Sequence, residues 1–210
     1  MKISTIFDRY IPQGQCPCKS FSRKMAVFLG ILLAIPVIVA ISRPVASAET
    51  DKCRNPGPAL NRFVPALPPR PVTQRPFFDV TGAPLTLAKY QGRGLVLNFW
   101  ATWCIPCVRE LPALAQLRKN LSTQGVEVIA LSIDRGGVPV VRKFMAKIGI
   151  DNLAILIDVK GKVSRKSRVR GLPSTILIDA DGIERGRVVG YTEWDTDDAA
   201  EFIRRCIGRQ

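Results

Sequence analysis

The sequence predicts an α/β domain in which a central mixed β-sheet is flanked by helices, and three observations support this fold class. Residues 95–100 form an almost continuously apolar run, as expected of a strand that is covered on both faces. Residues 108–121 follow with leucines at helical spacing. Strand-like and helix-like runs then alternate as far as a final hairpin and helix, which is the order of a layered sheet.

The first half of the domain starts at residue 76 and contains the two core strands. Its predicted elements are, in order, an N-terminal β-hairpin extension (77–80 and 85–87), a strand (95–100), a helix (108–121), a second strand (126–133) and a helix from Pro139 to Gly149. Gly125 is a stop signal between the first helix and the second strand. Pro139 suits the first turn of a helix, and Gly149 suits its end.

The second half of the domain runs to the end of the chain at residue 210. Its predicted elements are a short strand (153–157), a short helix (160–170), two antiparallel strands (176–178 and 187–189) around a turn at 179–182, and a closing helix that ends near Cys206. Thr196 is the candidate N-cap of the closing helix. Asp197 and Asp198 suit the positive end of its macrodipole.

Two cysteines stand between the first core strand and the helix after it, in the order Cys104-Ile105-Pro106-Cys107. Strand, Cys-x-x-Cys and helix is the setting of a redox pair. Unpaired N–H groups and the macrodipole at a helix start stabilise a thiolate, so Cys104 is predicted to be the attacking, exposed sulfur. Cys107, one turn deeper, is predicted to attack the mixed disulfide and release the product. Pro106 fixes φ where a missing N–H does no harm.

Composition excludes most other chemistries. The 210 residues, of which 47% are hydrophobic, fit one domain and a targeting segment. There is no histidine, which excludes Ser-His-Asp and Cys-His catalysis, histidine-ligated zinc and haem attachment through Cys-x-x-Cys-His. Half of a zinc site is the alternative for the cysteine pair, but no second downstream Cys-x-x-Cys completes it. The sequence therefore predicts no cofactor and no metal.

Residues 98–112 have the sequence Asn-Phe-Trp-Ala-Thr-Trp-Cys-Ile-Pro-Cys-Val-Arg-Glu-Leu-Pro. This stretch resembles the active-site stretch of the TlpA/ResA type of thioredoxin-like thiol-disulfide oxidoreductases. The similarity continues in residues 171–175, Gly-Leu-Pro-Ser-Thr, and in the closing segment 190–206. It covers roughly residues 76–206. The resemblance implies a thioredoxin-like fold for residues 76–210.

Four positions of the resemblance concern the site. Pro173 matches the family's cis-proline, which implies that it lies beside Cys104 and that its free backbone edge pairs with an incoming extended polypeptide. Glu110 matches a family acid, which implies proton relay to and from Cys107. An ordinary turn proline and a solvated helix glutamate are the alternatives. Asn98 stands where ordinary thioredoxins have a buried aspartate; an amide cannot take up a proton, so Glu110 or water must serve instead.

The resemblance also implies a function. It predicts a dedicated reductant that receives electrons from a membrane thiol transporter and reduces cysteine pairs in apo-cytochromes c or in copper-site proteins of cytochrome oxidase. A monomer without nucleic-acid binding is expected. The residues between the cysteines do not decide between reduction and oxidation. A thiol peroxidase and a copper carrier are the alternatives, although the sequence lacks the Pro-x-x-x-Thr-x-x-Cys order of the former and has only three methionines for the latter.

Residues 25–41 form an uncharged apolar run preceded by basic residues, which indicates an export signal. Its length lies between that of a signal-peptide core and that of a membrane span. Ala-Ser-Ala at 46–48 resembles a cleavage site, whereas the long polar stretch before the run resembles the cytoplasmic end of an anchor, so residues 25–48 are a signal peptide or a membrane anchor. In both cases residues 1–24 are predicted to be cytoplasmic and the domain periplasmic, either soluble or anchored to the inner membrane.

Residues 49–75 are rich in proline and short of periodic apolar residues, which predicts an extended linker. Cys53 in this linker and Cys206 in the closing helix have no assigned role. An oxidising compartment would allow them to form a structural disulfide, but spacing does not decide whether they do. Some relatives tie an N-terminal cysteine to the late hairpin; here Ile183 stands at that position.

The formal net charge is +14, and part of it is concentrated just before Pro173. Residues 160–170 contain no acidic residue and six basic ones: Lys160, Lys162, Arg165, Lys166, Arg168 and Arg170. This cluster could steer acidic partner proteins or lie near anionic lipid. A merely solvated basic helix is the alternative.

Overall fold

The structure is a computed structural model that describes residues 52–208. The predicted cytoplasmic segment (1–24) and the predicted signal peptide or anchor (25–48) lie outside the described residues. Within residues 52–208, every helix is too short or too polar to cross a membrane.

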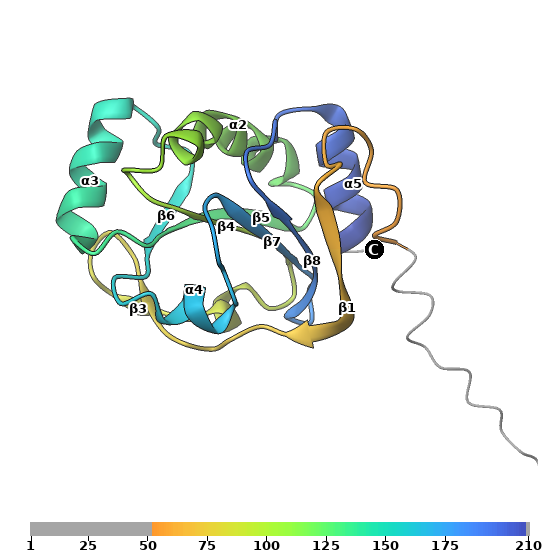
Figure 1. The fold of residues 1–210 in the computed structure, drawn as a ribbon, viewed down its shortest axis with the longest axis horizontal. Coiled ribbons are helices and arrows are strands. Elements are labelled where there is room, and N and C mark those ends of the chain that lie inside the picture. The colour runs from red at the N-terminus through yellow and green to blue at the C-terminus, as the bar shows by residue number, and fades with distance from the viewer. Residues whose placement is uncertain (1–51, 209–210) are drawn as a thin grey trace, which may run out of the picture. The chain divides into compact units, whose positions relative to one another are not determined.

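The described residues form one eight-stranded sheet with the strand order β1-β8-β7-β4-β5-β6-β2-β3 (Figure 1). Strands β4, β5 and β6 are parallel to one another, and the other neighbours are antiparallel, so the sheet is mixed. The strands are β1 (Phe63–Pro71), β2 (Phe77–Phe78), β3 (Pro84–Leu85), β4 (Gly94–Trp100), β5 (Val126–Ser132), β6 (Ala154–Ile157), β7 (Ser174–Ile178) and β8 (Ile183–Val189). The helices are η1 (Leu87–Tyr90), α2 (Ile105–Leu121), α3 (Gly137–Ile148), α4 (Lys162–Lys166) and α5 (Asp197–Ile207).

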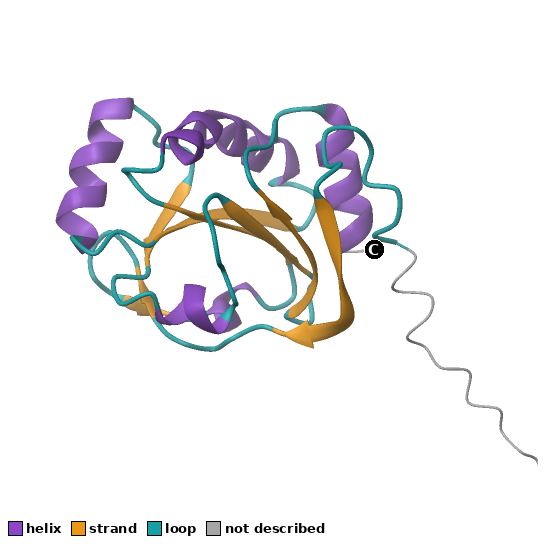
Figure 2. Ribbon diagram, viewed as in Figure 1, coloured by secondary structure: helices purple, strands orange, loops and turns teal. Residues whose placement is uncertain are grey.

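Helices cover both faces of the sheet, with α2, α3 and α5 on one face and α4 and η1 on the other (Figure 2). The central strand β4 is buried along its whole length and divides its side chains between the two cores. Val96 and Trp100 pack in the core under α2 and α5, whereas Leu97 and Phe99 pack in the core with α4. This alternation follows from the two-residue period of a strand. The fold is the predicted α/β sheet.

The sheet brings the end of β4 next to the start of β7. Phe99 of β4 pairs with Ser174 of β7, so Pro173 lies beside the point at which the chain leaves β4 for the cysteine pair. The helix ends predicted at Gly149 and Thr196 are confirmed, whereas α3 begins at Gly137, two residues before the predicted start at Pro139. Gly149 ends α3 in the left-handed conformation with φ 67°, and the Thr196 hydroxyl accepts the Ala199 N–H at 3.3 Å.

The structure differs from the predicted linker at residues 63–71, which form strand β1. This strand pairs antiparallel with β8, from Phe63 opposite Val188 to Pro71 opposite Ile183. It lies at the edge of the sheet, where only one side of its backbone needs hydrogen bonds, so prolines are tolerated. At the other edge, β2 and β3 pair with each other, Phe77 opposite Leu85.

Cys53 and Cys206 form a disulfide, with their Cα atoms 4.5 Å apart. Both residues are buried. The end of α5 holds the neighbouring chain as well, because the Arg205 guanidinium donates hydrogen bonds to the carbonyls of Lys52, Arg54 and Asn55. The segment before β1 is therefore fixed to the closing helix.

Candidate active site

The cysteine pair lies at the start of α2. Cys104 is the N-cap residue, with extended backbone geometry, and its carbonyl accepts the Val108 N–H at 3.0 Å. Pro106 lies in the first turn, where its missing N–H breaks no helical hydrogen bond. The Cys104 sulfur is therefore placed at the positive end of the macrodipole, which favours the thiolate.

Cys104 and Cys107 are joined by a disulfide, with their Cα atoms 5.3 Å apart. Cys104 is 6% exposed and Cys107 is fully buried. Cys104 is thus less exposed than predicted, although it is the more accessible residue of the pair. Its neighbours Trp103 and Ile105 are 67% and 74% exposed and form an apolar rim. A partner must therefore contact this rim to reach the Cys104 sulfur.

A buried carboxylate holds the loop between β4 and the cysteines. Asp134, just after β5, accepts the Thr102 N–H at 2.9 Å and the Thr102 hydroxyl at 2.7 Å. The Ser132 hydroxyl also donates a hydrogen bond to the Asp134 carboxylate, at 2.7 Å. These bonds fix the backbone two residues before Cys104, so Asp134 is a positioning residue for the loop.

Glu110 is buried on α2, with 1% of the residue exposed. Its carboxylate accepts hydrogen bonds from Asn98 Nδ2 at 2.7 Å, from the Thr192 N–H at 3.3 Å and from Trp194 Nε1 at 3.4 Å. Burial raises the pKa of Glu110 to about 7, and the three hydrogen bonds oppose this rise. The alternative of a solvated helix glutamate is wrong.

The spacing between Cys107 and Glu110 puts both side chains on one face of α2, because residues three apart on a helix are neighbours. Both side chains are buried. A carboxylate with a pKa of about 7 is well matched to a proton that must be taken up and returned near neutral pH. The geometry is therefore suited to proton exchange with Cys107.

Asn98 of β4 connects this carboxylate to the sheet. Its Nδ2 donates to Glu110 and also to the Thr175 hydroxyl at 2.9 Å. Its Oδ1 is buried and has no hydrogen-bond partner among the described residues. Asn98 therefore cannot replace the aspartate of ordinary thioredoxins as a proton acceptor, but it orients the residue that can.

Replacing Asn98 with alanine is expected to raise the pKa of Glu110 above about 7, because the hydrogen bond from Asn98 stabilises the charged carboxylate. The Glu110 carboxyl carbon shift, followed by NMR against pH, measures this directly. Thr175→Val is the matched control, since it removes the other partner of Asn98 and leaves the bond to Glu110. If Glu110 titrates with the same midpoint in Asn98→Ala as in the wild type, the hydrogen bond from Asn98 does not stabilise the charged carboxylate.

Pro173 follows a cis peptide bond, as the resemblance implies, and it is buried. Its carbonyl accepts the Gly190 N–H at 2.9 Å. The backbone edge of Pro173 is therefore not free, and the prediction that it pairs with a substrate needs correction. The backbone of Leu172, one residue earlier, has no hydrogen-bond partner among the described residues.

The structure brings Cys104, Cys107, Glu110 and Asn98 together and places Pro173 at the neighbouring strand end. Sequence reasoning missed Asp134, Thr192 and Trp194. Thr192 and Trp194 donate to Glu110 from more than 80 residues away, and no local pattern indicates them. Asp134 follows a core strand directly, and a polar residue at a strand end was the one signal that could have found it.

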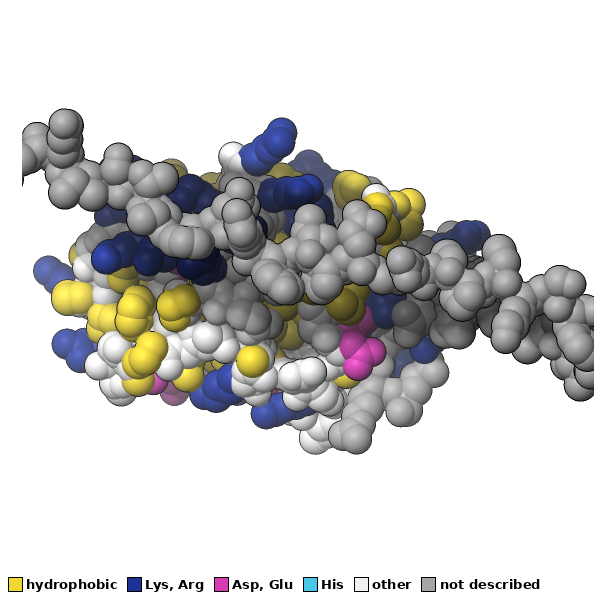
Figure 3. Space-filling view, turned by 90° about the horizontal axis from the view of Figure 1, so that it is seen from below, with side chains coloured by type: hydrophobic (Ala, Val, Ile, Leu, Met, Phe, Trp, Pro, Cys, Tyr) yellow, Lys and Arg dark blue, Asp and Glu magenta, His cyan; other side chains and the backbone are white. Residues whose placement is uncertain are grey.

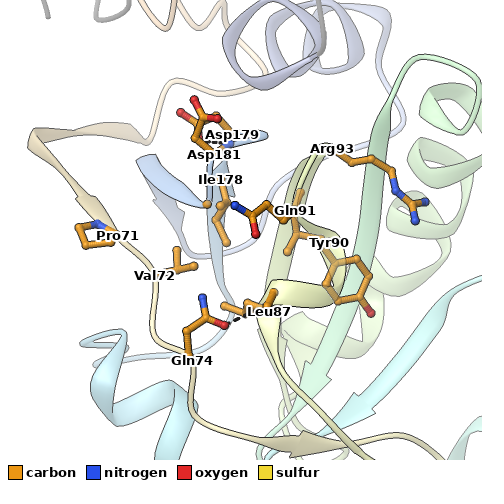
Figure 4. Close-up of a pocket in the computed structure, with 13 residues that line it drawn as sticks. Pro71, Val72, Gln74, Leu87, Tyr90, Gln91, Arg93, Ile178, Asp179 and Asp181 are labelled. Atoms are coloured by element: carbon orange, nitrogen blue, oxygen red, sulfur yellow. Dashed lines mark hydrogen bonds between the residues drawn. The ribbon is translucent and has the colours of Figure 1, made fainter.

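A separate cavity of about 120 Å³ lies between the end of β1, η1 and the turn at 179–182 (Figure 4). Val72, Leu87 and Ile178 line its apolar part. Gln74 also lines the cavity, and its side-chain oxygen accepts the Ala88 N–H at 3.1 Å (Figure 4). No cysteine lines this cavity, so it is not part of the site. Within residues 52–208, no three His, Cys, Asp or Glu side chains are placed to hold a metal ion.

Comparison with known proteins agrees with this geometry. The profile of the AhpC/TSA family matches residues 67–185. The thiol-disulfide oxidoreductase ResA of Geobacillus kaustophilus is 35% identical over 127 residues, which are 60% of this chain and 72% of that relative. ResA of Bacillus subtilis is 36% identical over 104 residues, 50% of this chain and 57% of that relative.

A solved structure shows the same fold. The thiol:disulfide interchange protein of the thioredoxin family from Chlorobium tepidum superimposes with a TM-score of 0.54 at 25% identity, over 65% of this chain and 97% of that one. The chain belongs to the AhpC/TSA family, among the thioredoxin-like proteins of the ResA type, and it is a thiol-disulfide oxidoreductase.

Proposed function

We propose that the protein reduces disulfides of exported proteins on the periplasmic side of the inner membrane, in the biogenesis of cytochromes c or of cytochrome oxidase. The observation that carries the chemistry is Glu110, buried on the same helix face as Cys107 with a pKa of about 7. Cys104, Cys107 and Glu110 act in the exchange, and the loop ending at Pro173 guides the substrate.

In the first step, the reduced protein attacks the substrate. The Cys104 thiolate, stabilised at the start of α2, attacks one sulfur of the substrate disulfide. A Cys104–substrate disulfide forms, and the other substrate sulfur leaves as a thiolate. Trp103 and Ile105, which are exposed on either side of Cys104 in the chain, are available to contact the bound substrate.

In the second step, the substrate is released. Glu110 takes the proton of the Cys107 thiol, and the Cys107 thiolate attacks the Cys104 sulfur. The Cys104–Cys107 disulfide forms while the second substrate sulfur leaves as a thiolate, so two electrons have passed to the substrate. A membrane thiol transporter then returns two electrons to the cysteine pair.

Replacing Glu110 with glutamine is expected to slow the second step about 100-fold at pH 7, because an amide cannot accept the Cys107 proton. In the wild type, this step should accelerate as the pH rises through about 7, where Glu110 ionises. Stopped-flow measurement of substrate release from the preformed mixed disulfide gives the rate of this step against pH for the wild type and for Glu110→Gln. If the two profiles keep the same shape, Glu110 is not the proton acceptor.

The same substitution gives a stability test that does not depend on activity. Since burial raises the pKa of Glu110 from 4.5 to about 7, the folded protein keeps a proton that the unfolded chain loses between these values. The free energy of unfolding of the wild type should therefore fall by about 3 kcal/mol from pH 4.5 to 7, relative to Glu110→Gln. Urea unfolding of both proteins at several pH values measures this difference. If the free energies of unfolding of the two proteins change equally with pH, the raised pKa of Glu110 is refuted.

The sequence and the relatives support the proposed location and partners of the protein. The apolar run at 25–41, preceded by basic residues, supports export of the domain. The resemblance to TlpA/ResA proteins supports apo-cytochromes c or copper-site proteins as substrates and a monomeric protein. The disulfide between Cys53 and Cys206 suits an oxidising compartment.

Insulin reduction tests the proposed activity. The full-length protein with dithiothreitol should cleave the insulin disulfides faster than dithiothreitol alone, and Cys104→Ser should lose this gain. Consumption of hydrogen peroxide by the reduced protein without insulin cleavage would favour a thiol peroxidase. Tight copper binding without insulin cleavage would favour a copper carrier.

A further inference from the structure

A strongly basic surface lies on α4 and on the residues just before and after it. All six of its side chains are exposed: Lys160, Lys162, Arg165, Lys166, Arg168 and Arg170. We call them the α4 basic surface. On the face of the molecule that carries α4, basic side chains gather and few acidic ones are visible (Figure 3).

No neighbouring acid neutralises the α4 basic surface. Among the described residues, none of its six side chains takes part in an ion pair. Asp158 is buried and accepts the backbone N–H groups of Lys162 and Ser164 at 2.8 and 2.9 Å. Glu184 is buried and is bound by Arg70 and Arg187. The positive charge of this surface is therefore left for a partner.

Two open hollows lie on this surface. Lys162, Arg165, Lys166 and Arg75 line a hollow of about 400 Å³. Arg165 and Lys166 also line a second hollow of about 560 Å³, which continues along Arg70 and Arg168. Apolar residues and the paired Glu184 also line the second hollow, so its cations stand along one side. A groove bordered by cations suits the side chains of an acidic polypeptide better than it suits a planar membrane.

The α4 basic surface leads to the redox site. Arg168 and Arg170 lie on the loop that runs from α4 to Pro173, which lies beside the end of β4. The three residues from Arg170 to Pro173 span at most about 11 Å. An acidic stretch that extends from α4 along the loop to Arg170 would therefore lie close to Pro173, beside the strand end that leads to the cysteine pair.

We propose that the α4 basic surface binds an acidic stretch of the redox partner and so brings that partner's cysteines to Cys104. This inference rests on the proposed function, since it names the chemistry of the partner. The chain's own undescribed ends do not fit the groove, because residues 1–51 and 209–210 carry more basic than acidic residues. Opposite charge raises the rate of encounter, and salt screens the effect.

Two synthetic peptides test the proposal. They share one internal disulfide and differ only in a flanking run of glutamates or of glutamines. The reduced full-length protein should reduce the glutamate peptide about tenfold faster than the glutamine peptide at about 20 mM salt. At about 300 mM salt the two rates should approach each other.

Two triple variants with equal changes in net charge separate the surface from the total charge. Lys162→Glu, Arg165→Glu and Lys166→Glu together should abolish the preference for the glutamate peptide. Arg142→Glu, Lys143→Glu and Lys147→Glu, all exposed on α3, should retain most of it. Both variants should reduce the glutamine peptide at the wild-type rate, which shows that folding and redox chemistry are intact.

Each remaining outcome counts against the proposal in a distinguishable way. If the wild type reduces neither peptide, the proposed function fails, and this inference fails with it. If both triple variants lose the preference equally, only total charge matters and the surface is not a binding site. The surface is a membrane contact if the α4 variant keeps the preference but binds phosphatidylcholine vesicles containing phosphatidylglycerol less well than the wild type does.

Discussion

Replacing Cys107 with serine is expected to halt the reaction after the first step, so that a stable mixed disulfide between Cys104 and the substrate accumulates. Cys104 can still attack, but the hydroxyl of serine cannot displace the substrate sulfur, so turnover should fall at least about 1,000-fold. The mass of the covalent complex, measured after trapping with acid, identifies the linkage. The complex should disappear on treatment with dithiothreitol.

The matched variant is Cys104→Ser, which should form no complex because Cys107 is fully buried. Both variants retain the Cys53–Cys206 disulfide, so a difference between them reports on the cysteine pair alone. A complex formed by Cys104→Ser and absent from Cys107→Ser would reverse the assigned roles of the two sulfurs.

Removing the Cys53–Cys206 disulfide is expected to have the largest effect on stability. The bond closes a loop with a sequence separation of 153 residues, and the chain-entropy estimate for such a loop is about 5 kcal/mol. This is comparable with the whole stability of many domains. The double variant Cys53→Ala and Cys206→Ala should therefore unfold at a much lower urea concentration.

The double variant Cys104→Ser and Cys107→Ser is the control. Its lost disulfide spans only three residues, so the entropy term is much smaller. Urea midpoints and slopes should be compared under non-reducing conditions. Equal losses in the two double variants would show that the long disulfide does not fasten the N-terminal segment to α5.

Local sequence was sufficient where one segment carries the whole signal. The apolar run of β4 and the spacing of Cys104 and Cys107 placed the redox pair at the start of α2, because strand burial and helix capping depend on neighbouring residues. Thr196 and Gly149 were predictable as helix ends for the same reason.

Local sequence failed where a distant partner decides the structure. The prolines of residues 63–71 indicated a linker, but pairing with β8 makes this segment an edge strand. The pKa of Glu110 depends on burial beside Thr192 and Trp194, which reach it only in the folded chain. The resemblance identified Glu110 as an acid of the site, whereas its environment became visible only in the structure.

The reduction potential of the Cys104–Cys107 pair tests the central claim most directly. Equilibration of the full-length protein with mixtures of reduced and oxidised glutathione, read out by thiol alkylation and mass, gives this value. A reductant should lie near the potential of thioredoxin, about −270 mV. A value near that of DsbA, about −120 mV, would contradict the account, because such a pair removes electrons from its partners.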